Sequence, residues 1–263
     1  RSSSTPQFLS EFFKFSIVLT LCRIVIIVYV YSISKNMKKI LEETLEKNIA
    51  LERSQLVIQT FGNLSIRIDT DKVAIKPSGV NLKNLKANEI SIVNLDNKHI
   101  SGLLPSVDTP THTYLYKNFQ DIHSIVHTHS LYASSWAQSQ KNIPCYGTTH
   151  ADYVNGELPC TRPLTKNEIE NNYEENTAKV IVETIIEKKL SPYDIPGILV
   201  GSHGVFSWGE SSEESLNNAE VIEYLGFLAF NSVNLNPNLG PVPKYLNDFH
   251  FNRKHGPNKY YGQ

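Results

Sequence analysis

The chain has 263 residues, of which 40% are hydrophobic and 19% are charged, and its formal net charge is −1. A chain of this length and apolar content can bury a substantial core as a single domain. The near-neutral charge gives no basic surface for nucleic acid. The sequence contains no Walker loop, dinucleotide glycine fingerprint, Cys-x-x-Cys pair or internal repeat, which argues against the common nucleotide-binding and dithiol redox classes.

The first 36 residues differ from the rest of the chain. Their apolar stretch, Ile17–Tyr31, contains Arg23 and is shorter than the roughly 20 apolar residues that a membrane span needs. The only methionine, Met37, stands directly before an amphipathic pattern. We therefore interpret residues 1–36 as translation of sequence upstream of the native start and 37–263 as one functional domain, with no membrane partner expected. A genuine signal anchor is the alternative.

The cysteines indicate a reducing compartment. Cys22, Cys145 and Cys160 form an odd and sparse set, which is not a disulfide framework. A cytoplasmic location is therefore expected.

Hydrophobic periodicity predicts alternating helices and short strands. The expected helices, which show apolar residues at helical spacing or begin with a capping signal, are 37–54, 108–119, 130–140, 167–189, 211–231 and 244–254. The expected strands are 64–68, 73–76, 89–95, 124–127 and 197–201. Asp108 is expected to cap its helix, and Ser211 with Glu214 to form a capping box. Short strands linked by tight turns and flanked by helices favour a mixed layered fold.

The sequence His127-Thr128-His129 is the strongest functional signal. Side chains two positions apart lie on one face of an extended segment, so both imidazoles can reach one ion. His203 follows another apolar strand and can supply a third ligand, which would leave an open position as in catalytic zinc sites. A pair of core histidines that bind no metal is the simpler alternative.

Several motifs together resemble the L-ribulose-5-phosphate 4-epimerases of the class II aldolase/adducin family. They are His127-Thr128-His129-Ser130, Gly147-Thr148-Thr149-His150-Ala151-Asp152-Tyr153, Pro159-Cys160-Thr161-Arg162, Ser202-His203-Gly204 and the terminal Tyr260-Tyr261-Gly262-Gln263. The likeness extends from Met37 to Gln263. It implies a three-layer α/β/α fold around a mostly antiparallel sheet, and a homotetramer whose active sites lie between subunits.

The resemblance also implies roles for particular residues. Zinc, with manganese or cobalt as alternatives, would be held by His127, His129 and His203, with Asp108 at or near the metal. The residues that would contact substrate are Gly62, Asn63, Lys76, Ser78, Gly79, Ser106, Val107, Thr148, Glu174 and His250. Val107 stands where the family usually has serine, and an unreplaced phosphate hydrogen bond there would cost about 1.5–3 kcal/mol. His150 is expected to be a positioning residue rather than a fourth ligand.

The implied substrate is a pentulose 5-phosphate, with L-ribulose 5-phosphate and D-xylulose 5-phosphate interconverted by cleavage and re-formation of the C3–C4 bond. The metal would stabilise the cleaved ketose as a Lewis acid. Asp152 would exchange a proton on one face of the aldehyde, and Tyr261 of a neighbouring subunit on the other. If the terminal residues do not dock in this way, they are a flexible tail. An aldolase of the same fold and a non-catalytic adducin-like association module are the rival interpretations.

Overall fold

The computed structural model describes residues 31, 34–257 and 259–260. The chain divides into two compact units, Arg1–Ile40 and Leu41–Gln263, and the second contains the sheet and the predicted site residues. Except for Tyr31, the apolar stretch Ile17–Tyr31 lies outside the described residues, as does Tyr261. In the part of the chain that is described, no helix has the length and apolar character needed to cross a bilayer.

The centre of the second unit is a seven-stranded sheet with the order β4-β3-β2-β1-β5-β7-β6, in which neighbouring strands are antiparallel. The strands are β1 Asn63–Arg67, β2 Lys72–Ile75, β3 Ser91–Asn94, β4 His99–Ser101, β5 Ser124–Thr128, β6 Gly197–Leu199 and β7 Val205–Gly209.

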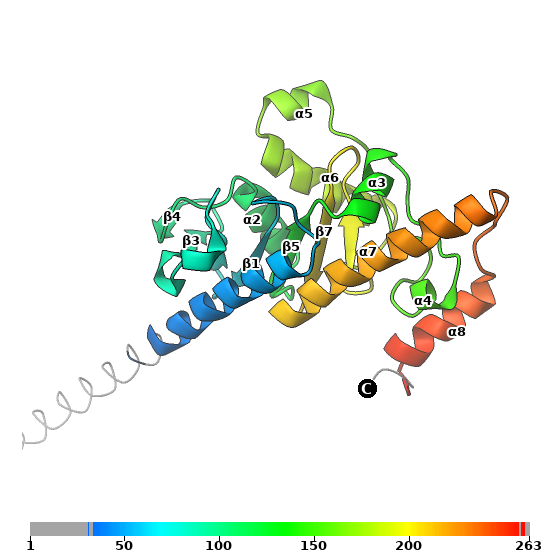
Figure 1. The fold of residues 1–263 in the computed structure, drawn as a ribbon, viewed down its shortest axis with the longest axis horizontal. Helices are drawn as coiled ribbons and strands as arrows, with labels where there is room; N and C mark the ends of the chain where they lie inside the picture. Colours follow the sequence, from blue (N-terminus) through cyan, green and yellow to red (C-terminus); the bar gives the residue numbers. More distant parts are fainter. Residues whose placement is uncertain (1–30, 32–33, 258, 261–263) are drawn as a thin grey trace, which may run out of the picture. The chain divides into compact units, whose positions relative to one another are not determined.

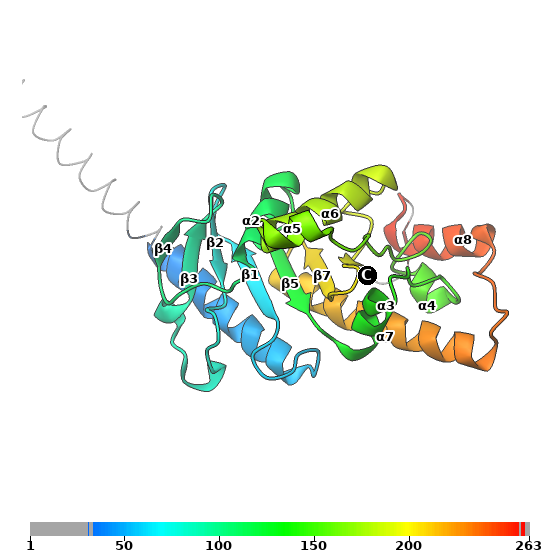
Figure 2. The same ribbon diagram turned by 90° about the horizontal axis from the view of Figure 1, so that it is seen from above.

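Helices cover both faces of this sheet. Figures 1 and 2 show α7 (Ser212–Leu235) and the helix over residues 41–53 on one face, with α2 (Thr109–Asn118) and α6 (Tyr173–Glu187) on the other. The remaining helices are the short 3₁₀ turns Leu82–Asn84 and Ala87–Glu89, and α3 Leu131–Gln138, α4 Thr148–Ala151, α5 Lys166–Glu170 and α8 Lys244–His255. The three-layer α/β/α fold with an antiparallel sheet, expected from the family resemblance, is confirmed.

The interior strand β5 carries the histidine pair to the edge of the core. All five of its residues are buried, and it pairs with β1 on one side and β7 on the other. Ile125 and Val126 point to opposite faces and are both fully buried, so helices must pack on each side of this strand. A strand fixed by two ladders and two apolar layers gives His127 a well-determined position.

The predicted helix over 167–189 is wrong in one respect, because the structure breaks it into α5 and α6. Asn172 adopts a left-handed conformation with φ 62°, which ends the first helix and starts the second. The Asn176 side-chain amide donates to the carbonyl oxygens of Glu168 and Asn171 and so holds the turn closed. Asparagine tolerates this backbone conformation better than most residues, so the break has a clear sequence basis.

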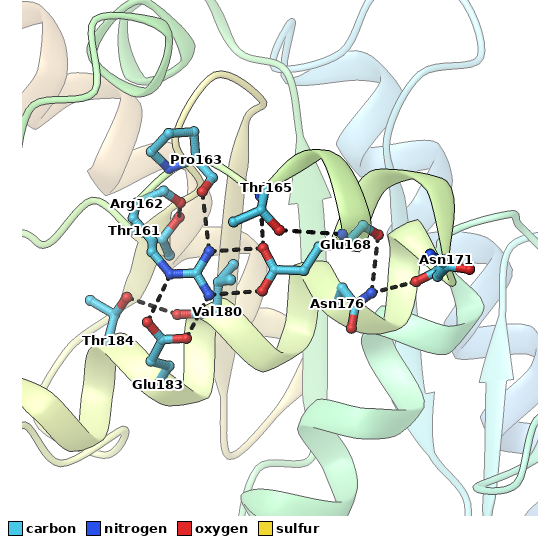
Figure 3. A network of polar contacts seen from close by, with 10 residues as sticks. All are labelled: Thr161, Arg162, Pro163, Thr165, Glu168, Asn171, Asn176, Val180, Glu183 and Thr184. Atoms are coloured by element: carbon cyan, nitrogen blue, oxygen red, sulfur yellow. Dashed lines mark hydrogen bonds and ion pairs between the residues drawn. The ribbon is translucent and has the colours of Figure 1, made fainter.

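Arg162 joins this helical pair to the neighbouring loop (Figure 3). Its guanidinium donates to both carboxylate oxygens of Glu168 in α5 and to both of Glu183 in α6, at 2.8–2.9 Å. The preceding residue, Thr161, accepts a hydrogen bond from Gly201 N at 3.0 Å. The loop, the two helices and the turn that leads to His203 are therefore held as one unit.

Other differences from the sequence-based expectation are local. The predicted strand 89–95 is shorter, because Glu89 ends a 3₁₀ turn, and β4 and α4 were not predicted. Strand β7 was also missed, and all five of its residues are buried, including Ser207 and Gly209. Ser211 caps α7 as expected, but the Glu214 carboxylate accepts from Glu210 N, which leaves the predicted capping box incomplete.

Candidate metal centre

Three imidazoles converge at the end of the central strands. His127 belongs to β5, His129 follows it by two residues, and His203 lies in the turn between β6 and β7. One ring nitrogen from each lies within 4.8 Å of the others, and His127 Nε2 is 3.1 Å from His129 Nε2. We call these three residues the histidine cluster. The convergence that the sequence spacing predicted is present.

The surroundings of His127 determine which of its nitrogens is available. Its Nδ1 donates to the carbonyl oxygen of Val205 at 2.9 Å, which leaves Nε2 for the cluster. The ring of Phe206 stacks on the imidazole at 4.2 Å between centroids and an interplanar angle of 14°. Gly204 is required beside it, because a Cβ atom there would lie 2.6 Å from Thr128 O. A ring held by a carbonyl bond and a stacked aromatic is preorganised as a ligand.

Two imidazoles of the cluster, those of His129 and His203, are held in the neutral form. Burial, followed by the proximity of His127, lowers the pKa of His129 to about 4. Burial and the proximity of both other histidines lower the pKa of His203 to about 3. Neutral imidazoles carry the free lone pairs that metal binding requires, and three nitrogens at this separation match the ligand set of an open zinc site. The residues present therefore fit a divalent metal.

Asp108 lies beside the cluster and is the N-cap residue of α2 as predicted, but its side chain makes no capping hydrogen bond. Its Oδ2 instead accepts from Asn63 Nδ2 at 2.7 Å, and the same amide donates to Ser106 Oγ at 3.1 Å. Burial opposes ionisation of Asp108, but interactions with His127 and His112 and the Asn63 hydrogen bond lower its pKa overall. Asp108 is not in the group whose ligand atoms lie within 4.8 Å, so its direct ligation stays a prediction.

The candidate phosphate residues lie near this site. Lys76 is 6% exposed and donates to Thr60 O at 3.0 Å, and burial lowers its pKa. A hollow of about 190 Å³ is lined by Lys76, Thr60 and Gly62, among other residues. Gly62 has φ +90° and approaches His127 O so closely that a side chain would collide with it.

Backbone contacts bring the other candidate segments together. Ser106 N donates to Lys76 O, and Ser78 N donates to Leu104 O, so the loops that contain Ser78, Gly79 and Ser106 are adjacent. Val107 is 66% exposed. The loss of a serine hydroxyl at this position therefore leaves no buried polar group unpaired.

A second group of polar residues, which we call the Asp152 cluster, forms between α4 and α8. Arg253 donates to Asp152 Oδ1 at 3.1 Å and to Oδ2 at 2.9 Å, while His250 Nδ1 lies 3.0 Å from Oδ1. His255 Nε2 donates to the backbone oxygen of Asp152 at 2.8 Å. Burial raises the pKa of Asp152, but the hydrogen bonds from Arg253 and His250 outweigh it and lower the pKa overall. Asp152 is thus a buried, ionised carboxylate.

The structure divides the predicted site residues between these two clusters. Four of the predicted residues lie with the histidine cluster, namely Asn63, Lys76, Ser106 and Asp108. Glu174 lies in α6, and its backbone oxygen accepts a hydrogen bond from Thr111 Oγ1 of α2. Asp152 and His250 belong to the other cluster, and Thr148 is the exposed first residue of the same helix α4. Within the described residues, the polar contacts of the Asp152 side chain go to α8 and not to the histidine cluster.

Sequence reasoning missed Arg253, which lies three residues after His250 on the same face of α8. That spacing is the signal that could have identified it. His150 is buried outside the histidine cluster, as expected for a residue that is not a ligand, and burial lowers its pKa to about 4.

Replacing a cluster histidine should abolish metal binding. We expect wild type to retain about one zinc per chain after dialysis and His127→Ala to retain almost none, because two imidazoles rarely suffice for a stable site. His99→Ala, which changes an exposed histidine of β4, is the matched control and should bind as wild type does. The measurement is metal content by plasma emission. Full occupancy in His127→Ala would refute the assignment.

Comparison with known proteins identifies the family. Residues 42–229 match the profile described as "Class II Aldolase and Adducin N-terminal domain". Proteins of Salmonella paratyphi A and Salmonella typhi named L-ribulose-5-phosphate 4-epimerase UlaF are each 44% identical over 230 residues, which cover 86% of this chain and 100% of theirs.

Solved structures with the same fold include an L-fuculose 1-phosphate aldolase and YgbL from Escherichia coli, titled a putative aldolase/epimerase/decarboxylase. The TM-scores are 0.67 and 0.65 at 20% and 22% identity, with 81% of this chain covered in both and 94% and 98% of theirs. The extent of the profile match and the identity to the curated relatives lead to one conclusion: the chain belongs to the class II aldolase/adducin family.

Proposed function

We propose that the protein is a zinc-dependent L-ribulose-5-phosphate 4-epimerase of the cytoplasm, which interconverts L-ribulose 5-phosphate and D-xylulose 5-phosphate by cleaving and re-forming the C3–C4 bond. The epimerase name of the 44% identical relatives supports the reaction. The observation that carries the proposal is the histidine cluster together with a separate, ionised Asp152. Metal chemistry and proton transfer are both needed, because C4 is beta to the ketone and has no acidic proton.

The histidine cluster would hold zinc through His127, His129 and His203, with Asp108 beside it. When bound there, zinc supplies Lewis-acid stabilisation of the negative charge that develops on the ketose oxygens as the C3–C4 bond breaks. His127 and His203 are fixed by neighbouring groups rather than by each other, so the ligand geometry precedes metal binding. Manganese or cobalt would be accepted by the same nitrogen ligands.

The residues near the histidine cluster would bind the sugar phosphate. Lys76 provides a buried cation, and the hollow beside it has room for a small anionic group. Asn63 is 2% exposed, and its amide oxygen has no hydrogen-bond partner among the described residues. A substrate hydroxyl that donates to this oxygen would satisfy it, because buried polar atoms are otherwise almost always paired. Ser78, Gly79 and Ser106 would complete the phosphate loops.

Asp152 is suited to accept a proton from the C4 hydroxyl. Because its pKa is lowered by Arg253 and His250, its carboxylate is ionised throughout the neutral pH range. The bonds from these residues also fix its direction, as general base catalysis requires. Tyr261 would serve the opposite face of the aldehyde, and its position lies outside the described residues.

We further propose that the active site is completed by a second copy of the chain in a homotetramer. Within one chain the contacts of the Asp152 side chain go to α8 rather than to the metal ligands. The protein also exposes a group of apolar side chains on α3 and α7, and such patches commonly mark subunit interfaces. The group includes Leu131 at 70%, Tyr224 at 53%, Phe227 at 38% and Phe230 at 45% exposure, with Tyr132 in contact with both phenylalanines.

An aldolase of the same fold is the second candidate. It is supported by the names of the fold neighbours, but at 20% identity these indicate the fold alone. Asp152 and Tyr261 would distinguish the two activities, because an epimerase needs a second proton-exchanging group on the other face of the aldehyde, which returns a proton to the C4 oxygen as the C3–C4 bond re-forms. The non-catalytic adducin-like role is disfavoured by the intact cluster of three histidines.

Asp152→Asn should retain metal but lose most epimerase turnover. The neutral amide keeps the shape of the carboxylate but cannot accept the proton, and we expect a loss of about 100-fold or more in kcat. Asp248→Asn, on the solvent side of α8, is the matched control. The assay follows D-xylulose 5-phosphate formed from L-ribulose 5-phosphate. Formation of dihydroxyacetone and glycolaldehyde phosphate without any D-xylulose 5-phosphate by the wild type would favour the aldolase.

Mixing two inactive variants should restore activity if the site lies between subunits. His203→Ala lacks the metal site and Asp152→Asn lacks the base, but a mixed oligomer contains sites that have both. After co-refolding of equal amounts, random assembly gives roughly a quarter of the wild-type activity, because each site needs one intact contribution from each of two chains. Activity that never rises above that of the separate variants would show that both residues act within one chain.

A further inference from the structure

The break between α5 and α6 brings Tyr173 into contact with His203, one of the predicted metal ligands. Tyr173 is the first residue of α6, directly after the left-handed Asn172. Its hydroxyl lies 3.3 Å from His203 Nδ1, and the two rings are 5.9 Å apart between centroids. A continuous helix over 167–189 would have no left-handed residue here, so the position of this hydroxyl depends on the break.

The contact occupies the nitrogen of His203 that a metal would not use. With Nδ1 next to Tyr173, Nε2 is the nitrogen left for the cluster, as it is for His127. When Nε2 ligates a cation, Nδ1 carries the proton and donates it to the tyrosine oxygen.

The proposed metal site is the premise of this inference. We propose that Tyr173 is a positioning residue for the metal centre, whose hydroxyl accepts a hydrogen bond from His203 Nδ1 and thereby fixes the ring with Nε2 toward the metal. This role differs from that of substrate-binding or proton-transferring groups. Tyr173 would orient the His203 ring through Nδ1, as the Val205 carbonyl oxygen orients the His127 ring.

The first turn of α6 is held rigidly enough to perform this role. Thr111 Oγ1, in the first turn of α2 next to Asp108, donates to Glu174 O at 2.6 Å. Thr177 Oγ1 donates to Tyr173 O at 2.9 Å. Farther along, Arg162 bridges α5 and α6 (Figure 3), and its neighbour Thr161 receives the bond from Gly201 N. The tyrosine and the turn that carries His203 are thus fastened to the same loop.

Backbone hydrogen bonds restrain the turn of His203, and its ring packs against those of His127, His129 and Phe206. Ser202 N donates to Ala137 O at 2.8 Å, and Val200 N donates to Gly204 O at 2.8 Å. These backbone bonds fix where the Cα atom of His203 lies, but they do not themselves orient the imidazole. The hydroxyl of Tyr173 is the hydrogen-bond partner of the His203 ring among the described residues, so it adds a directional restraint to the ring packing.

The test compares metal affinity in Tyr173→Phe and wild type, using the full-length chain stripped of metal. The variant keeps the ring and removes only the hydroxyl, and Tyr193→Phe, which changes a 50% exposed tyrosine, is the matched control. We expect zinc affinity, measured by competition with a chromophoric chelator, to fall about 10- to 100-fold in Tyr173→Phe and to remain unchanged in the control. The visible absorption of the Co²⁺ form should also change, because the ligand field depends on the orientation of His203.

Circular dichroism and the melting temperature of the metal-free proteins establish that each variant folds. A Tyr173→Phe protein with wild-type zinc affinity and an unchanged Co²⁺ spectrum would overturn the inference, even if its turnover were reduced, because the hydroxyl would then act on substrate. Failure of the wild type to bind zinc at all would instead refute the proposed function. The two failures are therefore distinguishable.

Discussion

Three imidazoles face one another with ring nitrogens within 4.8 Å, and the structure around them holds this arrangement in place. Burial and the proximity of neighbouring histidines lower the pKa values of His129 and His203, so these two rings do not take up protons at neutral pH. A divalent metal bound between the rings would satisfy the lone pairs of all three nitrogens, because its positive charge takes the place of protons. The free energy of binding that metal would offset the cost of holding the ligands together.

The fold supplies this arrangement from elements that are far apart in sequence. A central strand buried on both faces delivers His127 and His129, and the next hairpin delivers His203. The first turns of α2 and α6 border the cluster and are joined to each other by Thr111. The proposed proton acceptor, Asp152, belongs to a separate cluster with α8, so metal binding and proton transfer are assigned to independently held parts of the chain. Assembly of subunits is the step proposed to bring them together.

Periodicity predicted a mixed layered fold, and the His-x-His spacing predicted that two imidazoles share one face, because both are local properties. The three-layer architecture with an antiparallel sheet followed from the family resemblance. The hydrogen bond from Asn63 to the Asp108 side chain was not predicted, since it joins residues 45 positions apart. Strand β7, which has only five residues, was also missed. The helix break at Asn172 was visible only as the pair Asn171-Asn172 in an otherwise helical pattern. The missed features thus depend on tertiary contacts or on a single backbone angle.

X-ray absorption at the zinc edge tests the central claim most directly, because it reports the ligands of the bound metal in solution. If the three histidines hold the metal, the spectrum of the zinc-loaded protein shows nitrogen and oxygen scatterers at about 2.0–2.1 Å, with the outer-shell pattern of about three imidazole rings. A spectrum that contains only oxygen scatterers, or that lacks the outer-shell signal of imidazole, would contradict the account.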